Sequence, residues 1–351
     1  MADRVPGALL SEHTTLRLGG PAAELVRATT EEQLVDAVRD ADERGAPVLV
    51  LGGGSNLVVA DEGFQGRVVE VATRGVHPDY DGDDPTCGGV VVRVAAGEPW
   101  DDLVATAVPR GWVGLEALSG IPGSVGASPV QNVGAYGQEV SQTVSRVRAW
   151  DRHEGRLRTF AGVDCEFAYR HSRFKAEPGR YVVLTVDFQL PLGSLGAPVT
   201  YAELARTLGV EPGQRAPLGE VRDAVLGLRR GKGMVLDADD HDSWSAGSFF
   251  TNPVVEADRV PEGAPAWPAG EGRAKTSAAW LIQHAGFDRG HLPAGGSGSV
   301  SLSTKHTLAL TNRGGATTDE LLVLAREVRD GVEAAYGIRL VNEPVLVGCA
   351  L

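Results

Sequence analysis

Apolar and polar residues follow two periods along this chain, one typical of amphipathic helices and one typical of strands. The helical period is clearest over 317–336, where apolar residues recur every three or four positions from Leu321 to Ala335. Thr317 and Glu320 form a capping box at the start of this segment, and a glycine follows its end. The pattern therefore predicts a long helix with one buried face.

The N-terminal part of the chain predicts a βαβ unit. A short apolar run at 24–28 indicates a strand, and the following helix is expected to have Thr29 as N-cap, with Glu32 completing a capping box. A second strand is expected at 47–51 and leads into the glycine turn 52–56, GGGSN. Further strands are expected at 57–59, 68–72, 90–95, 144–150, 156–160, 181–190, 308–311 and 339–347, and further helices at 100–108, 200–208, 218–230 and 277–284.

The order of these elements predicts the fold class. A βαβ unit mixed with antiparallel hairpins is typical of α+β proteins rather than of a doubly wound sheet. The stretch 191–198 is rich in Pro, Gly and Ser and indicates a linker. We therefore expect two domains, with the first plausible boundary at this linker.

Composition and charge exclude several classes of protein. The 351 residues are 42% hydrophobic and 23% charged, as in ordinary globular proteins. The net charge of −13 argues against a nucleic-acid-binding surface. Cys87, Cys165 and Cys349 lack disulfide or metal-ligand spacing, so we expect free thiols, no metal and a reducing compartment. No segment has the pattern of a signal peptide or a membrane span, so we expect a cytoplasmic protein.

Residues 119–137, SGIPGSVGASPVQNVGAYG, form a glycine-rich loop with no helical or strand period. Gly reaches positive φ angles and Pro fixes φ, so a stretch of this kind is typical of irregular backbone. A surface linker is one interpretation. Long irregular connections inside compact domains are uncommon unless they are functional, which favours a loop that holds a flat or anionic ligand against the backbone.

The glycine turn 52–56 differs from the common phosphate-binding motifs. A dinucleotide fingerprint continues into a helix, whereas this turn is followed by an apolar run that indicates a strand. A Walker A loop requires a lysine before Ser or Thr, and none is present here. The turn is therefore either a plain tight turn or a nest of backbone N–H groups that binds an anion.

Three polar residues stand out from their surroundings. Glu343 lies in an apolar segment and, by strand alternation, shares a face with Val341 and Val345, so it is either at an exposed edge or in a site. Arg170 lies among aromatic residues and could bind a carboxylate or simply be solvated. Ser248 precedes two phenylalanines and, taken alone, is more typical of a structural serine that bonds its own backbone.

Taken together, these segments resemble the UDP-N-acetylenolpyruvoylglucosamine reductase (MurB) family over nearly the whole chain. Each motif is weak alone, but their order and spacing are highly specific. The resemblance rests on LGGGSN at 51–56, the glycine-rich loop at 119–137, YRHSRFK at 169–175, GSFFTNPVV at 247–255, AAWLI at 278–282 and NEPVLVG at 342–348.

The resemblance implies a vanillyl-alcohol-oxidase-like (PCMH-type) FAD-binding domain at 16–192 and a smaller α+β reductase and substrate-binding domain at 200–351. It also implies that the last strand, about 339–351, returns to the FAD-binding domain. It implies noncovalent FAD, NADPH as hydride donor, and reduction of the substrate's enolpyruvyl group in peptidoglycan precursor synthesis. The implied cofactor-binding residues are Gly53, Gly54, Ser55 and Asn56 at the pyrophosphate, and Ser119, Ile121, Gly123, Gly126 and Ala127 along the rest of the flavin.

The resemblance also assigns the remaining site residues. Its catalytic set of arginine, serine and glutamate matches Arg170, Ser248 and Glu343, with Ser248 as the proton donor. Tyr201, in VTYAEL, matches the tyrosine loop of the long form of the family, and Lys232 and Asn252 match residues that hold the diphosphate. The implied partner is a small nucleotide-sugar substrate, with no nucleic acid and no membrane insertion, and we expect a monomer.

Two alternatives remain open. One is a different flavin-dependent oxidase or dehydrogenase of the same fold, and the other is a flavin- or nucleotide-sugar-binding protein without catalytic activity. Two positions depart from the family pattern: His306 stands where a glutamine is expected, and the acidic stretch 79–89, expected to be an exposed loop, has no counterpart.

Overall fold

The computed structural model describes residues 3–80 and 89–351 and forms two compact units. Unit 1 comprises Met1–Ala8, Ala22–Gly53 and Gln65–Arg230, and unit 2 comprises Leu9–Pro21, Gly54–Phe64 and Gly231–Leu351. Among the described residues, no helix is both long and apolar enough to cross a bilayer. Most of the expected loop 79–89 lies outside the described residues.

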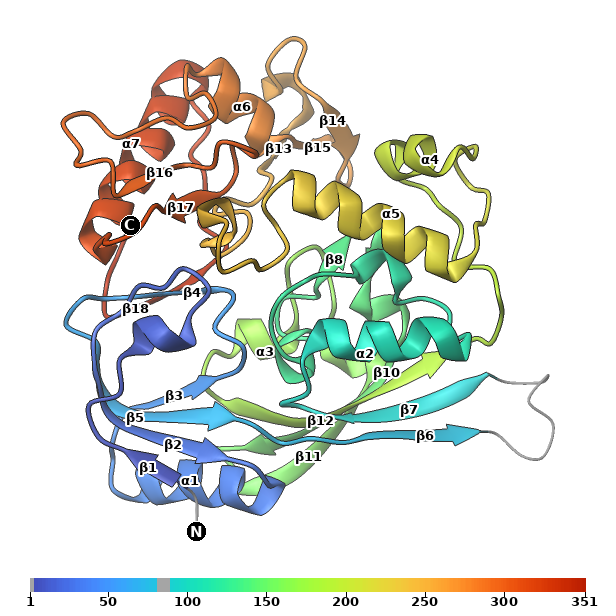
Figure 1. Cartoon of the computed structure of the whole chain (residues 1–351), viewed down its shortest axis with the longest axis vertical. Coiled ribbons are helices and arrows are strands. Elements are labelled where there is room, and N and C mark those ends of the chain that lie inside the picture. The colour runs from blue at the N-terminus through green and yellow to red at the C-terminus, as the bar shows by residue number, and fades with distance from the viewer. Residues whose placement is uncertain (1–2, 81–88) are drawn as a thin grey trace. The chain divides into compact units, whose positions relative to one another are not determined.

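Two sheets form the framework of unit 1 (Figure 1). The first has the order β1-β2-β5-β3, in which β1 is antiparallel to β2 and β3 is parallel to β5. The second is antiparallel throughout, with the order β11-β10-β12-β7-β6. The strands are β1 (Asp3–Val5), β2 (Ala22–Ala28), β3 (Val48–Leu51), β5 (Phe64–Val71), β6 (Val76–Tyr80), β7 (Val90–Ala95), β10 (Val144–Asp151), β11 (Arg156–Ala161) and β12 (Tyr181–Leu190).

Helices α1 and α2 of unit 1 lie on these sheets (Figure 1). Helix α1 buries the face that carries Leu34 and Val38, and α2 buries Trp100, whose ring contacts Phe188 of β12 edge to face at 6.0 Å. The helices are α1 (Glu31–Glu43), α2 (Trp100–Ala107), α3 (Arg173–Ala176), α4 (Ala202–Leu208) and α5 (Leu218–Gly231). The predicted βαβ order is present in the chain, but β5 lies between β2 and β3 in the sheet.

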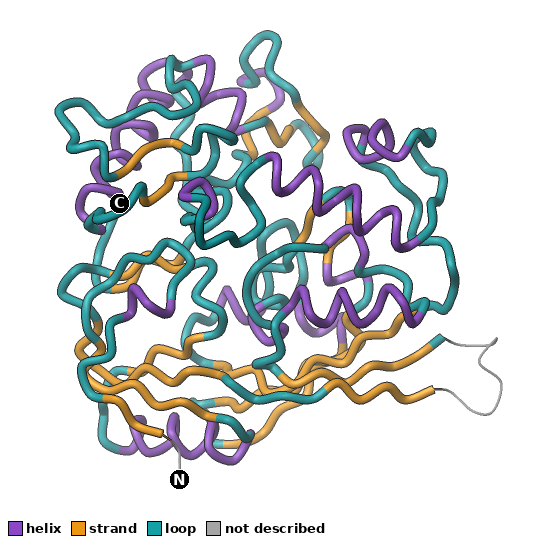
Figure 2. Tube along the Cα trace, in the orientation of Figure 1, coloured by secondary structure: helices purple, strands orange, loops and turns teal. Residues whose placement is uncertain are grey.

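Unit 2 is built from short strands and two helices. Most of the strand-forming chain, orange in Figure 2, therefore belongs to unit 1. The longest helix, α7, packs on β16 and β17 and buries Leu321, Leu324, Val328 and Val332. The elements are β4 (Leu57–Val59), β13 (Val254–Glu256), β14 (Ala266–Pro268), β15 (Arg273–Thr276), α6 (Ala278–His284), β16 (Val300–Leu302), β17 (Leu310–Asn312), α7 (Thr318–Tyr336) and β18 (Val345–Val347).

The unit boundaries differ from the expected domain boundaries. The linker 191–198 does not divide the units, because Leu204 of α4 and Val221 of α5 share a small core with Ala117 of unit 1. The last strand, β18, pairs with β4, a strand that lies within the expected domain 16–192, although both strands belong to unit 2. Segments distant in sequence therefore complete each unit. The assignment of FAD to the first expected domain and of the substrate to the second stays a prediction.

Three local predictions need correction. The N-cap of α1 is Thr30 rather than Thr29, because the Thr30 hydroxyl accepts the Gln33 N–H. Ala335 of α7 is exposed rather than part of the buried face. The strand expected at 339–347 forms only at Val345–Val347, because Pro344 has no N–H to donate to a ladder.

Candidate functional site

Gly53, in the glycine turn, meets the glycine-rich loop within unit 1. A Cβ added at Gly53 would lie 2.6 Å from the Cα of Gly123, so the two backbones approach too closely for any side chain. Gly53 is exposed, and Ile121 and Gly123 are half-buried. Among the described residues, the backbone N–H groups of these three donate no hydrogen bond. Accessible backbone donors on a bare surface suit an anionic group such as a pyrophosphate.

The first half of the glycine-rich loop is anchored to unit 1 by backbone hydrogen bonds. It contains a 3-10 turn at Val125–Ala127, in which Val125 N–H donates to Glu98 and Gly126 N–H donates to Ala96. A side chain at Gly126 would collide with Ala96. This part of the loop is therefore a rigid surface rather than a linker.

Asp101 of α2 anchors the same loop from the side. Its carboxylate accepts the Gly120 N–H at 2.6 Å and binds the Arg222 guanidinium of α5 in a bidentate pair at 2.7 and 2.9 Å. Burial alone would raise the pKa of Asp101, but Arg222 and the Gly120 N–H outweigh it and hold the pKa below its usual value. The carboxylate is therefore ionised at neutral pH.

Arg170 is held against the second half of the loop. Its backbone is in the left-handed region at φ 51°, which strains a residue other than glycine and is characteristic of functional positions. The Arg170 guanidinium donates to the Gly134 carbonyl at 3.2 Å. Lys175 Nζ binds both the Arg170 carbonyl, at 2.9 Å, and the Gln131 side chain, at 2.8 Å. Unit 1 therefore brings the predicted arginine and the predicted flavin loop together.

Tyr201 also contacts the glycine-rich loop. It precedes α4, its side chain is 46% exposed, and its ring meets Tyr136 edge to face at 5.4 Å. Arg229, near the end of α5, is buried, and burial lowers its pKa to about 10, although Tyr136 and Asp101 act in the opposite direction. The guanidinium still carries its charge at neutral pH.

Unit 2 brings Ser248 and Glu343 onto neighbouring segments. Glu343 N–H donates to the Phe249 carbonyl at 2.8 Å, and Phe250 forms an antiparallel bridge with Asn342. Phe249 and Phe250 are 1% exposed, which fixes the Ser248 segment in the core. Within the described part of the chain, the Ser248 hydroxyl makes no hydrogen bond. The hydroxyl is therefore available to a ligand.

The surroundings of Glu343 differ from those expected for a strand. Val341 and Val345 are 63% and 49% exposed, so they do not mark a buried face. Glu343 itself is half-buried in irregular chain, and Asn56 holds this chain by donating from Nδ2 to the Glu343 carbonyl at 3.4 Å. The Asn56 carbonyl in turn accepts the Val345 N–H at 2.9 Å. The last residue of the glycine turn therefore supports the glutamate.

Several other predicted site residues already have protein contacts. The Ser119 hydroxyl is buried and donates to the Glu116 carbonyl at 2.6 Å, so Ser119 contributes its place in the backbone rather than its side chain. Asn252 is half-buried, and its Oδ1 accepts the Ala278 N–H at 2.9 Å. Lys232 is half-buried in the turn that follows α5.

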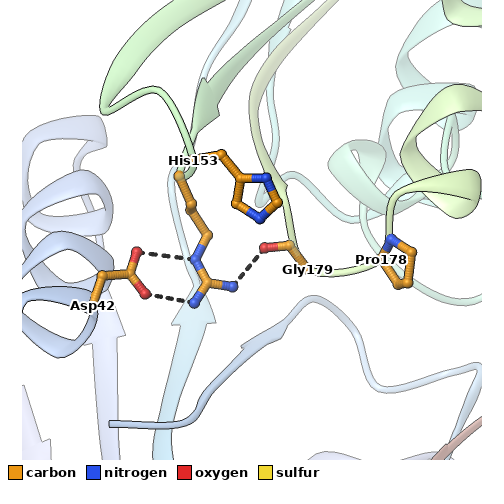
Figure 3. Close-up of a pocket in the computed structure, with 5 residues that line it drawn as sticks. Asp42, His153, Pro178 and Gly179 are labelled. Carbon is orange, nitrogen blue, oxygen red and sulfur yellow. Dashed lines mark hydrogen bonds and ion pairs between the residues drawn. The ribbon is translucent and has the colours of Figure 1, made fainter. Parts of the chain in front are cut away.

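A surface cavity of unit 1 lies elsewhere. Figure 3 shows its lining, in which Arg152 binds Asp42 of α1 in a bidentate pair and donates to the Gly179 carbonyl, beside His153 and Pro178. Its volume is about 390 Å³. None of the predicted site residues lines it, and its guanidinium is already bound by protein groups.

The polar residues that support the glycine-rich loop could not be identified from the sequence pattern. Asn132 donates to Glu139 and to the Ala168 carbonyl, and its own Oδ1 accepts the Ser141 N–H. Its φ of 44° is again left-handed. Asn in a glycine-rich loop was the one available signal, because Asn adopts left-handed backbone more readily than most residues.

Comparisons with known proteins cover both units. Residues 22–161 match the family model described as "FAD binding domain", and residues 239–347 match "UDP-N-acetylenolpyruvoylglucosamine reductase, C-terminal domain". The chain is 58% identical over 342 residues to the UDP-N-acetylenolpyruvoylglucosamine reductase of Cutibacterium acnes, with 97% of this chain and 90% of the relative covered. It is 56% identical over 359 residues to that of Streptomyces avermitilis, with 97% and 94% covered.

Among solved structures, UDP-N-acetylenolpyruvylglucosamine reductase (MurB) from Thermus caldophilus matches this chain with a TM-score of 0.65 at 27% identity, and 99% of each chain is covered. The expected fold class is thereby confirmed: the chain is α+β, and its N-terminal part is an FAD-binding domain.

Proposed function

Because the chain belongs to the UDP-N-acetylenolpyruvoylglucosamine reductase (MurB) family, we propose that it makes UDP-N-acetylmuramate for peptidoglycan synthesis. The substrate is UDP-N-acetyl-3-O-(1-carboxyvinyl)glucosamine, whose enolpyruvyl double bond is reduced to a lactyl ether. The enzyme is an FAD-dependent oxidoreductase that uses NADPH. The observation that carries this proposal is similarity along 97% of the chain, supported in the structure by the Ser248 and Glu343 segments being hydrogen-bonded to each other.

The glycine turn and the glycine-rich loop suit FAD. The close approach of Gly53 and Gly123 and the accessible N–H group of Gly53 support pyrophosphate binding at the turn. The proposed pyrophosphate-binding residues are Gly53, Gly54, Ser55 and Asn56. The rest of the flavin would lie along the small residues of the loop. The proposed lining residues are Ser119, Ile121, Gly123, Gly126 and Ala127.

When bound, FAD would supply hydride chemistry at the terminal carbon of the enolpyruvyl group, with NADPH as the source of the hydride. Negative charge then develops on the neighbouring carbon and on its carboxylate. Arg170, which is always charged and carries several donors, stabilises that charge. Glu343 assists in its protonated form, as a hydrogen-bond donor to the same group.

Ser248 donates the proton that completes the reaction. The proton goes to the carbon that carries the carboxylate, so the double bond gains one hydride and one proton and NADPH leaves as NADP⁺. A serine hydroxyl is a weak acid at neutral pH, and it therefore acts only when it is held against the reacting carbon. The buried Phe249 and Phe250 provide that constraint on the Ser248 backbone.

The remaining roles concern binding. Lys232 and Asn252 hold the diphosphate of the substrate, and Tyr201 closes over its uridine. The proposed roles divide between the units: Arg170 and Tyr201 belong to unit 1, and Ser248, Glu343, Lys232 and Asn252 belong to unit 2. We further propose that the protein works in the cytoplasm as a monomer.

The proposal is tested by product analysis. Protein loaded with FAD is mixed with NADPH and enolpyruvyl-UDP-N-acetylglucosamine, and consumption of NADPH is compared with formation of the lactyl ether by mass spectrometry. One NADPH should be oxidised for each product formed. Oxygen consumption that replaces product formation would instead indicate a flavin oxidase, and bound flavin without turnover would indicate a binding protein.

A further inference from the structure

Glu116 is a buried carboxylate with no part in the proposed chemistry. It belongs to the short 3-10 helix Glu116–Leu118 and is 1% exposed. A buried carboxylate is unfavourable unless hydrogen bonds satisfy its oxygens. Its partners therefore indicate what it holds in place.

Three N–H groups from three different segments donate to the Glu116 carboxylate. Oε2 accepts the Gly114 N–H at 2.7 Å, and Oε1 accepts the Ala197 N–H at 2.6 Å and Gln138 Nε2 at 2.9 Å. The other end of the Gln138 amide accepts the Ala117 N–H at 2.9 Å. All three of these groups are hydrogen-bond donors, so both carboxylate oxygens of Glu116 act as acceptors.

Glu116 contacts the glycine-rich loop at both ends, through its main-chain carbonyl at the start of the loop and through its carboxylate just after the end. Ser119, its first residue, donates to the Glu116 carbonyl through both its N–H, at 3.3 Å, and its hydroxyl, at 2.6 Å. Gln138, the residue directly after the loop, binds the Glu116 carboxylate. One residue thus fixes the distance between the two ends of the loop.

The Ala197 contact extends the same network to the tyrosine segment. A Cβ at Gly196 would lie 2.8 Å from Glu116 Oε1, so this segment packs directly on the carboxylate. Four residues after Ala197, the Tyr201 ring meets Tyr136 of the glycine-rich loop. Glu116 therefore supports the segment that leads to Tyr201 as well as the loop that Tyr201 contacts.

We propose that Glu116 is a positioning residue that sets the shape of the flavin loop and, through Ala197, the place of Tyr201. This inference rests on the proposed function for the identity of the two ligands. It assigns no chemical step to Glu116. It predicts that one buried carboxylate controls both FAD affinity and the contribution of Tyr201 to substrate binding.

The test uses the isosteric variant Glu116→Gln. An amide has one acceptor oxygen, so the NH₂ group of the new glutamine must face at least one of the N–H groups that now donate to the carboxylate. Reversing the Gln138 side-chain amide would satisfy this NH₂ group, but the Ala117 N–H would then lose its acceptor. The Kd for FAD, measured by quenching of flavin fluorescence, is expected to rise about tenfold. Glu32→Gln, an exposed residue of α1, is the matched control and should leave the Kd unchanged.

The link to Tyr201 is tested by a double-mutant cycle at saturating FAD. In the wild-type background, Glu116→Gln should raise the KM for the enolpyruvyl substrate about tenfold with little change in kcat. In the Tyr201→Ala background the same substitution should change KM less than twofold. A general loss of stability would not depend on Tyr201 in this way.

The outcomes separate the inference from the proposed function. A Kd for FAD equal to that of Glu32→Gln, or a KM effect that persists in Tyr201→Ala, would overturn the role of Glu116. Absence of turnover in the wild type would overturn the function, while FAD titration would still test the loop. If Glu116→Gln fails to fold, Gln138→Met removes two of the same hydrogen bonds and should weaken FAD binding in the same direction.

Discussion

Gly53→Ala should weaken FAD binding for a reason that is visible in the backbone. The φ of Gly53 is not in the left-handed region, so alanine can adopt it, and the obstacle is purely steric. The added Cβ would lie 2.6, 3.0 and 3.3 Å from the Cα, C and N atoms of Gly123. Carbon atoms pack at about 3.5–4.0 Å, so the turn and the loop must separate by about 1 Å. The neighbour is backbone and cannot rotate away.

Overpacking of this kind typically costs about 1–3 kcal/mol. If the turn keeps its position against Gly123, the steric strain remains in the folded apoprotein and its free energy of unfolding falls by that amount. If the turn moves away from Gly123, the strain is relieved but the FAD site is distorted, and the Kd for FAD rises by about 5- to 150-fold. The two quantities are measured together, by urea unfolding of the apoprotein and by titration of flavin fluorescence.

Gly219→Ala is the matched control, because a Cβ at this position in α5 meets nothing within 4 Å and its φ is also not left-handed. Alanine should stabilise the helix there by up to about 1 kcal/mol and leave FAD binding unchanged. The steric reasoning fails if Gly53→Ala matches this control in both stability and FAD affinity.

Three further substitutions test other parts of the structure. Ser248→Ala should leave reduction of bound FAD by NADPH intact and lower turnover by roughly three decades, since it removes the proton donor; stopped-flow measurement of equal losses in both half-reactions would mean that Ser248 is structural. Asp101→Asn should destabilise the apoprotein by roughly 1–2 kcal/mol at pH 7 in urea unfolding, because it breaks the Arg222 pair and weakens the Gly120 anchor. The pKa of Asp101 is lower in the folded protein than in the unfolded chain, where it is about 4. The stabilisation from Asp101 is therefore present above about pH 4 and is lost as the pH falls through the lower folded-state pKa. If the difference in unfolding free energy between Asp101→Asn and wild type does not shrink at low pH, this reasoning is contradicted. Asp242→Ala should lower the free energy of unfolding by about 3–5 kcal/mol, because this buried carboxylate binds Arg313 and both the N–H and the hydroxyl of Thr304; a loss below about 1 kcal/mol would show that these groups find other partners.

Elements specified by local patterns were predictable from the sequence. The predicted capping box of α7 is present, because Thr317 and Glu320 lie three residues apart and need no distant partner. The strands 90–95 and 181–190 were predicted with the bounds they have in β7 and β12, because the apolar runs end at turn residues. The N-cap of α1 was one residue off, since two adjacent threonines satisfy the same local criteria.

Features that depend on distant contacts could not be predicted in this way. The extent of unit 2 depends on β4 pairing with β18, two segments separated by most of the chain. Glu116 and Asn132 occupy irregular segments, where no period marks a buried polar side chain. Arg170 and Ser248 were weak candidates on residue type alone, and only the resemblance to a family distinguished them.

The central claim is tested most directly by an anaerobic experiment with the purified holoprotein. NADPH should bleach the visible absorbance of the oxidised flavin, and enolpyruvyl-UDP-N-acetylglucosamine should then restore it without oxygen. Recovery of colour should require the enolpyruvyl group, so UDP-N-acetylglucosamine should leave the flavin bleached. A flavin that NADPH bleaches but that the enolpyruvyl substrate does not reoxidise would contradict the account.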